Sequence, residues 1–136
     1  MDEALTRTIH EAMPLAAQLG FEALEGGPEA VVVRGAWARE RCTAAGVLHG
    51  GYLMSLADVT AATLAFLNLP AGASTTTIES KTNFLAAVRG GLVTARAEPV
   101  HLGRRTTVVQ VDITDDTGRL VTRTLQTQAV IEEGGG

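Results

Sequence analysis

One stretch of the sequence constrains the fold more than any other: the apolar run from Gly50 to Leu69, in which Asp58 is the only charged side chain. A His-Gly-Gly turn opens the run and Pro70 and Gly72 follow it, so it is expected to form one buried helix with defined ends. An ionised carboxylate in apolar surroundings is strongly unfavourable unless it is paired, protonated or close to water. Asp58 therefore needs a specific structural or chemical role.

The same run is long enough to raise the possibility of a membrane-spanning helix, but its polar residues argue against one. A charge at the centre of such a helix is penalised by roughly 2.5 to 3.5 kcal/mol on insertion scales. Ser55, Thr60, Thr63 and Asn68 make the run more polar still. We expect a helix buried in a protein core and no interaction with membranes.

Length, charge and cysteine content exclude several other classes of protein. The 136 residues, 46% of them hydrophobic, fit a single domain that spans residues 1–136. The net charge is -4, and the ten arginines and one lysine are spread along the chain, which argues against nucleic-acid binding. The single cysteine, Cys42, cannot form an intrachain disulfide or a cysteine-rich zinc site. No residue set suggests a metal site. The acidic start of the chain lacks an apolar signal segment, so we expect a cytoplasmic protein.

The hydrophobic pattern predicts helices and strands on both sides of the central helix. Residues 1–19 have helical periodicity that Pro14 breaks or restarts, and this N-terminal helix is expected to pack over the domain. Strands are predicted at residues 21–24 and 30–37 before the central helix, and at 75–85, 92–100, 106–114 and 120–131 after it. The sequence from Asp115 to Gly118 is typical of a hairpin turn, and residues 132–136 are expected to be a disordered tail.

One long helix and a long antiparallel sheet pack best when the sheet curls around the helix, which predicts an α+β fold. Helical projection turns one face toward the sheet: Leu53, Leu56, Ala57, Thr60, Leu64 and Leu67. Asp58 lies away from that face, beside Met54, Ala61, Ala62 and Ala65. No other element of the chain remains to cover these small residues, so we expect a second copy to pack there and form a homodimer.

Strict alternation in residues 75–85 predicts two faces of a rather polar strand. One face carries Thr76, Ile78, Ser80, Thr82 and Phe84, and the other carries Thr77, Glu79, Lys81, Asn83 and Leu85. Val109, Val111 and Ile113 share one face of the strand at 106–114.

Four local motifs together resemble those of a known family. They are His49-Gly50-Gly51, Ala57-Asp58, Asn83-Phe84-Leu85 and Gly103-Arg104-Arg105. With the terminal hairpin, they make the chain similar, over about residues 20–131, to the PaaI-type hot-dog-fold acyl-CoA thioesterases. The resemblance implies a long central helix wrapped by a curved antiparallel sheet, and hydrolysis of coenzyme A thioesters with aryl, phenylacetyl or medium-chain acyl groups. Coenzyme A is then part of the substrate, no separate cofactor is expected, and dimers or dimers of dimers would have active sites at subunit interfaces.

Thioester hydrolysis requires a donor for the developing oxyanion and a base or nucleophile at the carbonyl. Gly50 opens the helix, where its backbone N–H is unpaired and lies at the positive end of the helix dipole. Its missing side chain lets a carbonyl oxygen approach. The resemblance assigns the oxyanion role to Gly50, and Asp58 would either activate water or attack directly to form a mixed anhydride.

Gly50 and Asp58 cannot act on one carbonyl within the same chain. Eight residues separate them, which is about 12 Å along a helix. A site that uses both must combine Gly50 of one subunit with Asp58 of the partner.

Further candidates surround these two residues. His49 is expected to shape the turn as a hydrogen-bonding strut, although a general-base role is the alternative. Thr77 is a weaker candidate for a hydroxyl near the nucleophilic water, and Gly51 is a candidate substrate contact. Thr43 stands six residues before the histidine, where the family commonly has Asn or Gln, so the usual orientation of substrate or water is in question.

Arginines are natural partners for the phosphates of coenzyme A because their guanidinium groups bind phosphate in a forked manner. Arg104 and Arg105 follow Gly103 in a predicted loop, and Arg89 precedes a Gly-Gly turn. We expect phosphate contacts from these three residues, although adjacent arginines on a loop are often only solvated.

Two other functions compete with the thioesterase hypothesis. A non-catalytic acyl-CoA-binding or scaffold protein on the same fold would bind the ligand without hydrolysis. A hydratase or dehydratase is disfavoured because His49 and Asp58 follow the thioesterase arrangement. Cys42 as a nucleophile has little support, since the sequence places no partner histidine beside it.

Overall fold

The computed structural model describes residues 1–132. The tail predicted at 132–136 lies outside the described residues except for its first residue. The chain forms α1 (Glu3–Ala12), α2 (Pro14–Gln18), β1 (Glu22–Gly26), β2 (Val31–Ala36), α3 (Gly50–Leu67), β3 (Ser74–Phe84), β4 (Leu92–Leu102), β5 (Thr106–Asp115) and β6 (Leu120–Ile131). Two short 3-10 turns, Arg39–Arg41 and Ala44–Gly46, lie in the loop before α3. Each helix and strand predicted from the sequence is present, with ends displaced by two residues or fewer.

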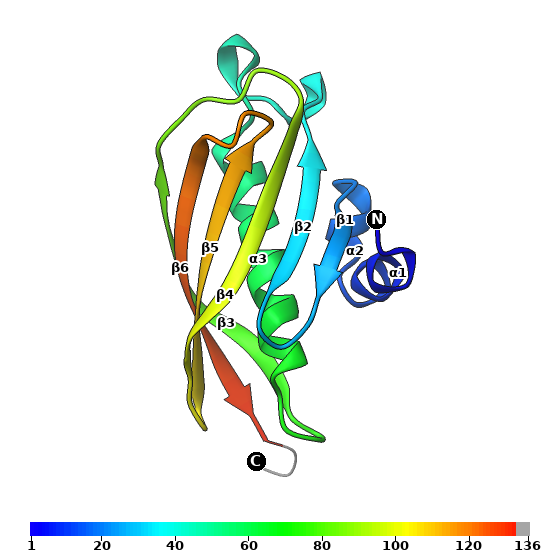
Figure 1. The fold of residues 1–136 in the computed structure, drawn as a ribbon, viewed down its shortest axis with the longest axis vertical. Helices are drawn as coiled ribbons and strands as arrows, with labels where there is room; N and C mark the ends of the chain where they lie inside the picture. The colour runs from blue at the N-terminus through cyan, green and yellow to red at the C-terminus, as the bar shows by residue number, and fades with distance from the viewer. Residues whose placement is uncertain (133–136) are drawn as a thin grey trace.

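The six strands form one antiparallel sheet in the order β1-β2-β4-β5-β6-β3. Figure 1 shows this sheet curving around α3, with α1 and α2 beside the β1 edge. Long hairpins connect β4, β5 and β6, and β3 follows α3 to take the other edge beside β6. This arrangement confirms the predicted α+β hot-dog class.

The core lies between α3 and the concave face of the sheet. Five of the six helix residues predicted to face the sheet are buried: Leu53, Leu56, Ala57, Thr60 and Leu64. Leu67 is 37% exposed because it ends the helix and lines a groove beside α1. Val109, Val111 and Ile113, which share one face of β5, are fully buried, and each such side chain stabilises the fold by about 1.5 to 3 kcal/mol.

The helix α3 is long and apolar enough to cross a membrane by length and composition alone, with a mean hydropathy of 1.3. Just over half of it, 56%, is nevertheless buried inside the domain. Burial to this extent is expected of a helix in a protein core, so packing against the sheet explains why α3 is apolar.

The expectation that a second subunit covers the small residues beside Asp58 is wrong for two of them. Ala61 and Ala65, predicted to lie under a partner chain, are fully buried within this chain. The helix contacts β2, β3, β4, β5 and β6, because the curved sheet wraps farther around it than a flat sheet could. Asp58 is reached by side chains of β3 and β6 and, like Met54 and Ala62, stays partly exposed.

The predicted alternation of faces along β3 is also wrong. A β-bulge between Thr77 and Glu79 shifts the register against β6, and Ile78 lies at the bulge, 61% exposed. Thr77 therefore donates a hydrogen bond to Asp58 on the inner side, while Thr82 bonds the buried Thr124 on that same side. A bulge inserts one extra residue and moves every later side chain to the opposite face from the one expected.

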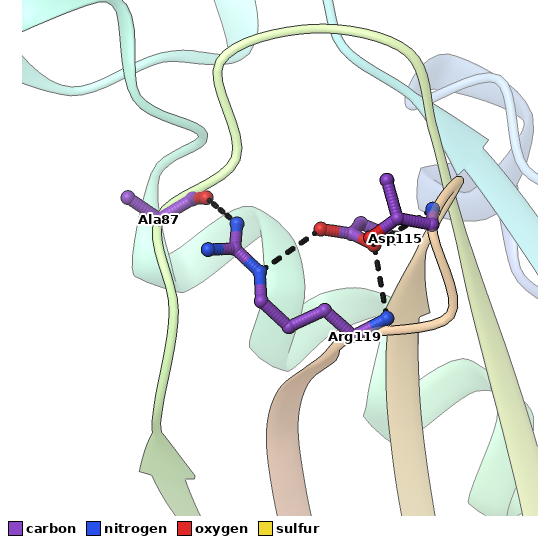
Figure 2. Close-up of polar contacts among 4 residues, drawn as sticks. Ala87, Asp115 and Arg119 are labelled. Carbon is purple, nitrogen blue, oxygen red and sulfur yellow. Dashed lines mark hydrogen bonds and ion pairs between the residues drawn. The ribbon is translucent and has the colours of Figure 1, made fainter.

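The turn between β5 and β6 is fastened by Asp115. Its carboxylate accepts bonds from the hydroxyl and N–H of Thr117 (2.7 and 2.9 Å) and from the N–H and Nε of Arg119 (both 3.1 Å). These donors, with the Thr117 hydroxyl foremost, lower the pKa of Asp115 to about 2. Arg119 also donates to the carbonyl of Ala87 at 2.8 Å, as Figure 2 shows, and so ties the hairpin to the loop before β4.

Candidate active site

The N-terminus of α3 is capped by His49. The ring Nδ1 of His49 accepts the N–H of Gly51 at 2.8 Å, and its backbone carbonyl accepts bonds from Tyr52 and Leu53. A Cβ at Gly51 would lie 2.9 Å from that Nδ1, so this position must lack a side chain for the cap to form. This bond is the one a strut role for the His49 ring requires, and it occupies the N–H of Gly51.

Gly50 is the first residue of α3 and presents an unpaired donor. Within residues 1–132 its N–H has no hydrogen-bond acceptor, and the residue is partly exposed. A Cβ at Gly50 would lie 3.2 Å from the ring of Phe84, so the aromatic ring flanks the backbone at this point. An open N–H at the positive end of an 18-residue helix is suited to receive a negatively charged oxygen.

The polar loop before α3 folds back onto the helix start. Cys42 and Leu48 form an isolated β-bridge, and the N–H of Thr43 donates to the carbonyl of Val47 at 2.8 Å. The Thr43 side chain is exposed and has no hydrogen bond within the described part of the chain. The structure therefore places Thr43 near the His-Gly-Gly turn, while Cys42 directs its thiol at the carbonyl of Ala38.

Tyr52 anchors the first turn of α3 to β2. Its hydroxyl accepts the N–H of Ala36 at 3.1 Å, and the guanidinium of Arg41 lies 5.5 Å from the centre of its ring. Burial raises the pKa of Tyr52, and the nearby Arg41 charge opposes that rise. A Cβ at Gly35 would overlap the tyrosine hydroxyl, so glycine is needed there for the helix to sit this close to β2.

Asp58 is held through one of its two oxygens. Gln126 Nε2 donates to Oδ1 at 2.8 Å, and Thr77 Oγ1 lies 2.9 Å from the same atom. The single Thr77 hydroxyl proton is shared between Asp58 Oδ1 and Gln128 Oε1, which lies closer at 2.6 Å. Oδ2 accepts no hydrogen bond from any group among residues 1–132, and Asp58 is partly exposed. The carboxylate is thus fixed in orientation with one oxygen open for chemistry.

Two buried glutamines behind Asp58 were not predicted from the sequence. Gln126 and Gln128 on β6 are almost completely buried, and Gln126 Nε2 also donates to Gln128 Oε1 at 2.7 Å. Polar residues occupy every second position of β6 there, namely Thr122, Thr124, Gln126 and Gln128. That repeat was the available signal, but alternation normally turns such a face toward solvent, whereas here it faces the helix.

The three arginines considered for phosphate binding do not lie together. Arg89 precedes β4 and Arg104 and Arg105 follow it, and this 11-residue strand is about 33 Å long. Arg89 is exposed and next to Val88, whose carbonyl accepts the N–H of Leu48 at the start of α3. Within one chain these arginines therefore lie in two separate places, Arg89 before β4 and the Arg104–Arg105 pair after it. Of the three, only Arg89 is near the Gly50 end of the helix.

An apolar groove of about 270 Å³ runs between α1 and the second half of α3. Ala62, one helical turn beyond Asp58, lines it together with Phe66 and, from α1, Ile9. Thr75, which accepts a bond from Gln128, forms its wall on the β3 side. Asp58 itself does not line the groove, which starts one helical turn farther along α3 at Ala62.

The sequence matches the family model described as the thioesterase superfamily over residues 45–122. The structure is similar to thioesterase HI1161 of Haemophilus influenzae, with a TM-score of 0.89, 30% identity, and coverage of 97% of this chain and 91% of that one. A protein of Mycobacterium tuberculosis, provisionally named an esterase, is 31% identical over 85% of this chain and 84% of its own. The 1,4-dihydroxy-2-naphthoyl-CoA hydrolase of Listeria monocytogenes is 38% identical over 56% of this chain and 62% of its own.

Proposed function

Because the chain belongs to the thioesterase superfamily, we propose that it hydrolyses acyl-CoA thioesters, with Asp58 as base or nucleophile and the Gly50 N–H as oxyanion donor. The observation that carries this proposal is the Asp58 carboxylate, held through Oδ1 with Oδ2 open. The name of the Listeria relative supports a coenzyme A thioester as substrate. Membership of the PaaI type and a cytoplasmic location remain predictions.

In the proposed reaction, the thioester carbonyl oxygen accepts the Gly50 N–H while negative charge develops on it. Asp58 Oδ2 removes a proton from water, whose oxygen adds to the carbonyl carbon, or it attacks that carbon itself to form a mixed anhydride that water then opens. The carbon–sulfur bond breaks in either route, and the coenzyme A thiolate leaves and takes up a proton. Thr77 contributes by holding Oδ1.

The site is proposed to form between two subunits. Gly50 and Asp58 lie on the same straight helix at about 12 Å separation, too far to contact one carbonyl. The edge strand β3 supports association because Ile78, Phe84 and Leu85 are 61%, 51% and 56% exposed on or beside it. An unpaired apolar edge is a natural surface for a second copy. We propose a homodimer with two shared sites and a dimer of dimers as the full assembly.

The groove between α1 and α3 is the proposed place for the acyl group. Its lining by Ala62, Phe66 and Ile9 is apolar, and its volume suits a medium-chain or aryl group. Arg89, close to the start of α3, is the proposed contact for a coenzyme A phosphate, with Arg104 and Arg105 of another subunit as further candidates.

The direct test is turnover of Asp58→Asn in a chromogenic thiol-release assay with short aliphatic, long aliphatic and aryl CoA esters. We expect kcat to fall about 10²- to 10⁴-fold while a non-hydrolysable thioether analogue still binds. Asp112→Asn is the matched control, since Asp112 pairs with Arg123 on the outer side of the sheet. Unchanged turnover in Asp58→Asn would refute the assignment, and a wild type that binds analogue without releasing thiol would identify a non-catalytic binding protein.

A further inference from the structure

The buried glutamine Gln126 has no role in the reaction as described so far, yet it contacts the reacting carboxylate. Its Nε2 donates to Asp58 Oδ1 at 2.8 Å from a side chain that is 0% exposed. We infer that Gln126 is a positioning residue, which fixes Asp58 through Oδ1 and so turns Oδ2 toward the reacting carbonyl or water. This inference rests on the proposed thioesterase function.

A chain of hydrogen bonds fixes the direction in which the Gln126 amide points. Thr75 Oγ1 donates to the backbone carbonyl of Ala129 at 2.8 Å, so it accepts from Gln128 Nε2 at 3.1 Å. Gln128 must then present its Oε1 to Gln126 Nε2 at 2.7 Å. Turning the Gln126 amide over would place its oxygen against both Gln128 Oε1 and the Asp58 carboxylate, which are acceptors. The backbone of β6 therefore determines, through these side chains, that Gln126 donates to Asp58.

The same orientation leaves Gln126 Oε1 buried without a partner in the part of the chain that the structure describes. A buried carbonyl oxygen without a donor is unfavourable, and an apolar side chain of similar length would remove it. The bond to the buried Gln128 Oε1 offsets part of this cost. The second bond of the same Nε2, to Asp58 Oδ1, is the one that bears on the reaction.

Both side chains that bond Asp58 act on the same oxygen. Thr77 and Gln126 approach Oδ1 from the neighbouring strands β3 and β6, while Oδ2 is left open. The Thr77 proton is shared with Gln128 Oε1 at 2.6 Å, so Gln126 is the donor that holds Oδ1 whichever way the hydroxyl turns, and it restricts rotation about the bond to the carboxylate. A displacement of a reacting group by about 1 Å can lower turnover about 100-fold, so this restriction is directly relevant to rate.

The test replaces the donor without changing the length of the side chain. In Gln126→Met we expect kcat to fall about 10- to 100-fold while KM changes less than about twofold, because substrate binding is not altered. Gln126→Asn keeps the amide but is too short to reach Asp58, and it should show the same loss if the methionine variant does not fold. Gln110→Met is the matched control, because Gln110 lies between the buried Val109 and Val111 on β5 and so points to the opposite, outer side of the sheet.

A double variant distinguishes positioning from a general structural role. If Gln126 acts through Asp58, then Gln126→Met should cause no further loss of residual turnover when Asp58 is already asparagine. An additional tenfold loss in that background, or full kcat in both Gln126→Met and Gln126→Asn, would overturn the inference. These outcomes differ from failure of the proposed function, in which the wild type releases no thiol or Asp58→Asn keeps its turnover.

Discussion

The backbone N–H of Gly50 can be removed with little disturbance to the fold by the substitution Gly50→Pro. Gly50 is the first residue of α3, where proline is well tolerated because its fixed φ suits the helix and no intrahelical N–H bond is lost. The preceding His49 has φ -62° and ψ 137°, an extended conformation that a following proline accepts. The change therefore acts chiefly on the donor.

The size of the effect follows from the role proposed for that donor. Loss of one oxyanion donor lowers kcat about 10²- to 10³-fold, equivalent to about 2.7 to 4 kcal/mol of transition-state stabilisation. A new Cβ would lie 3.2 Å from the Phe84 ring, which is a tight contact. Gly50→Ala adds the same Cβ but keeps the N–H. The ratio of kcat between Gly50→Ala and Gly50→Pro therefore measures the loss of the N–H donor together with the effect of the extra space that the proline ring occupies.

The assay is steady-state thiol release from the best CoA ester of the wild type, with melting temperatures measured in parallel. We expect Gly50→Ala to keep turnover within about tenfold of the wild type and Gly50→Pro to fall a further 10²-fold or more. Equal turnover in the two variants, with equal melting temperatures, would show that the Gly50 N–H does not contact the oxyanion.

Three further predictions concern the cap, the groove and the hairpin. His49→Asn should keep most turnover, because asparagine also caps helices. His49→Ala removes the cap and should lower the free energy of unfolding by about 0.5 to 2 kcal/mol. A large loss of turnover in both variants would indicate that His49 is a general base. Ala62→Phe should fill the groove and lower kcat/KM about tenfold or more for long acyl chains relative to acetyl-CoA; equal losses would exclude the groove as the acyl site. Because the pKa of Asp115 is lowered from 3.8 to about 2 in the fold, its stabilisation is present above pH 4 and is lost as the pH falls toward 2. Melting curves of Asp115→Asn should therefore show a smaller decrease over that range than those of the wild type.

The elements of this fold were predictable because their signals are local. The lone acid between a Gly-Gly turn and Pro70 defines α3, and the Asp-Asp-Thr-Gly sequence defines the last hairpin. The change from helical to alternating periodicity then leaves one packing for a single long helix and a curved sheet.

The errors arose where the structure depends on contacts distant in sequence. The bulge at Ile78 has no local signal in a strand of mixed polar residues, so the faces of β3 were assigned incorrectly beyond it. The curvature of the sheet is set by the twist of all six strands, and no periodicity in α3 reports how far the sheet reaches around it. Ala61 and Ala65 were assigned to a partner for that reason.

The candidate site was predictable only in part. Asp58 and Gly50 stand out because a charge in an apolar helix and a glycine at its start are visible in the sequence. The donor Gln126 lies 68 residues beyond Asp58, and its face of β6 is polar but buried against the helix. Nothing in a polar alternation distinguishes that arrangement from an ordinary solvent-facing strand.

The central claim is that each active site combines Gly50 of one subunit with Asp58 of its partner, and subunit mixing tests it most directly. Asp58→Asn and Gly50→Pro are unfolded together in equal amounts, refolded and assayed for thiol release. Random pairing makes half of the dimers hybrid, and each hybrid has one intact site of two, so about a quarter of the wild-type activity should return. Activity no higher than the average of the two separately refolded variants would contradict a site shared between subunits.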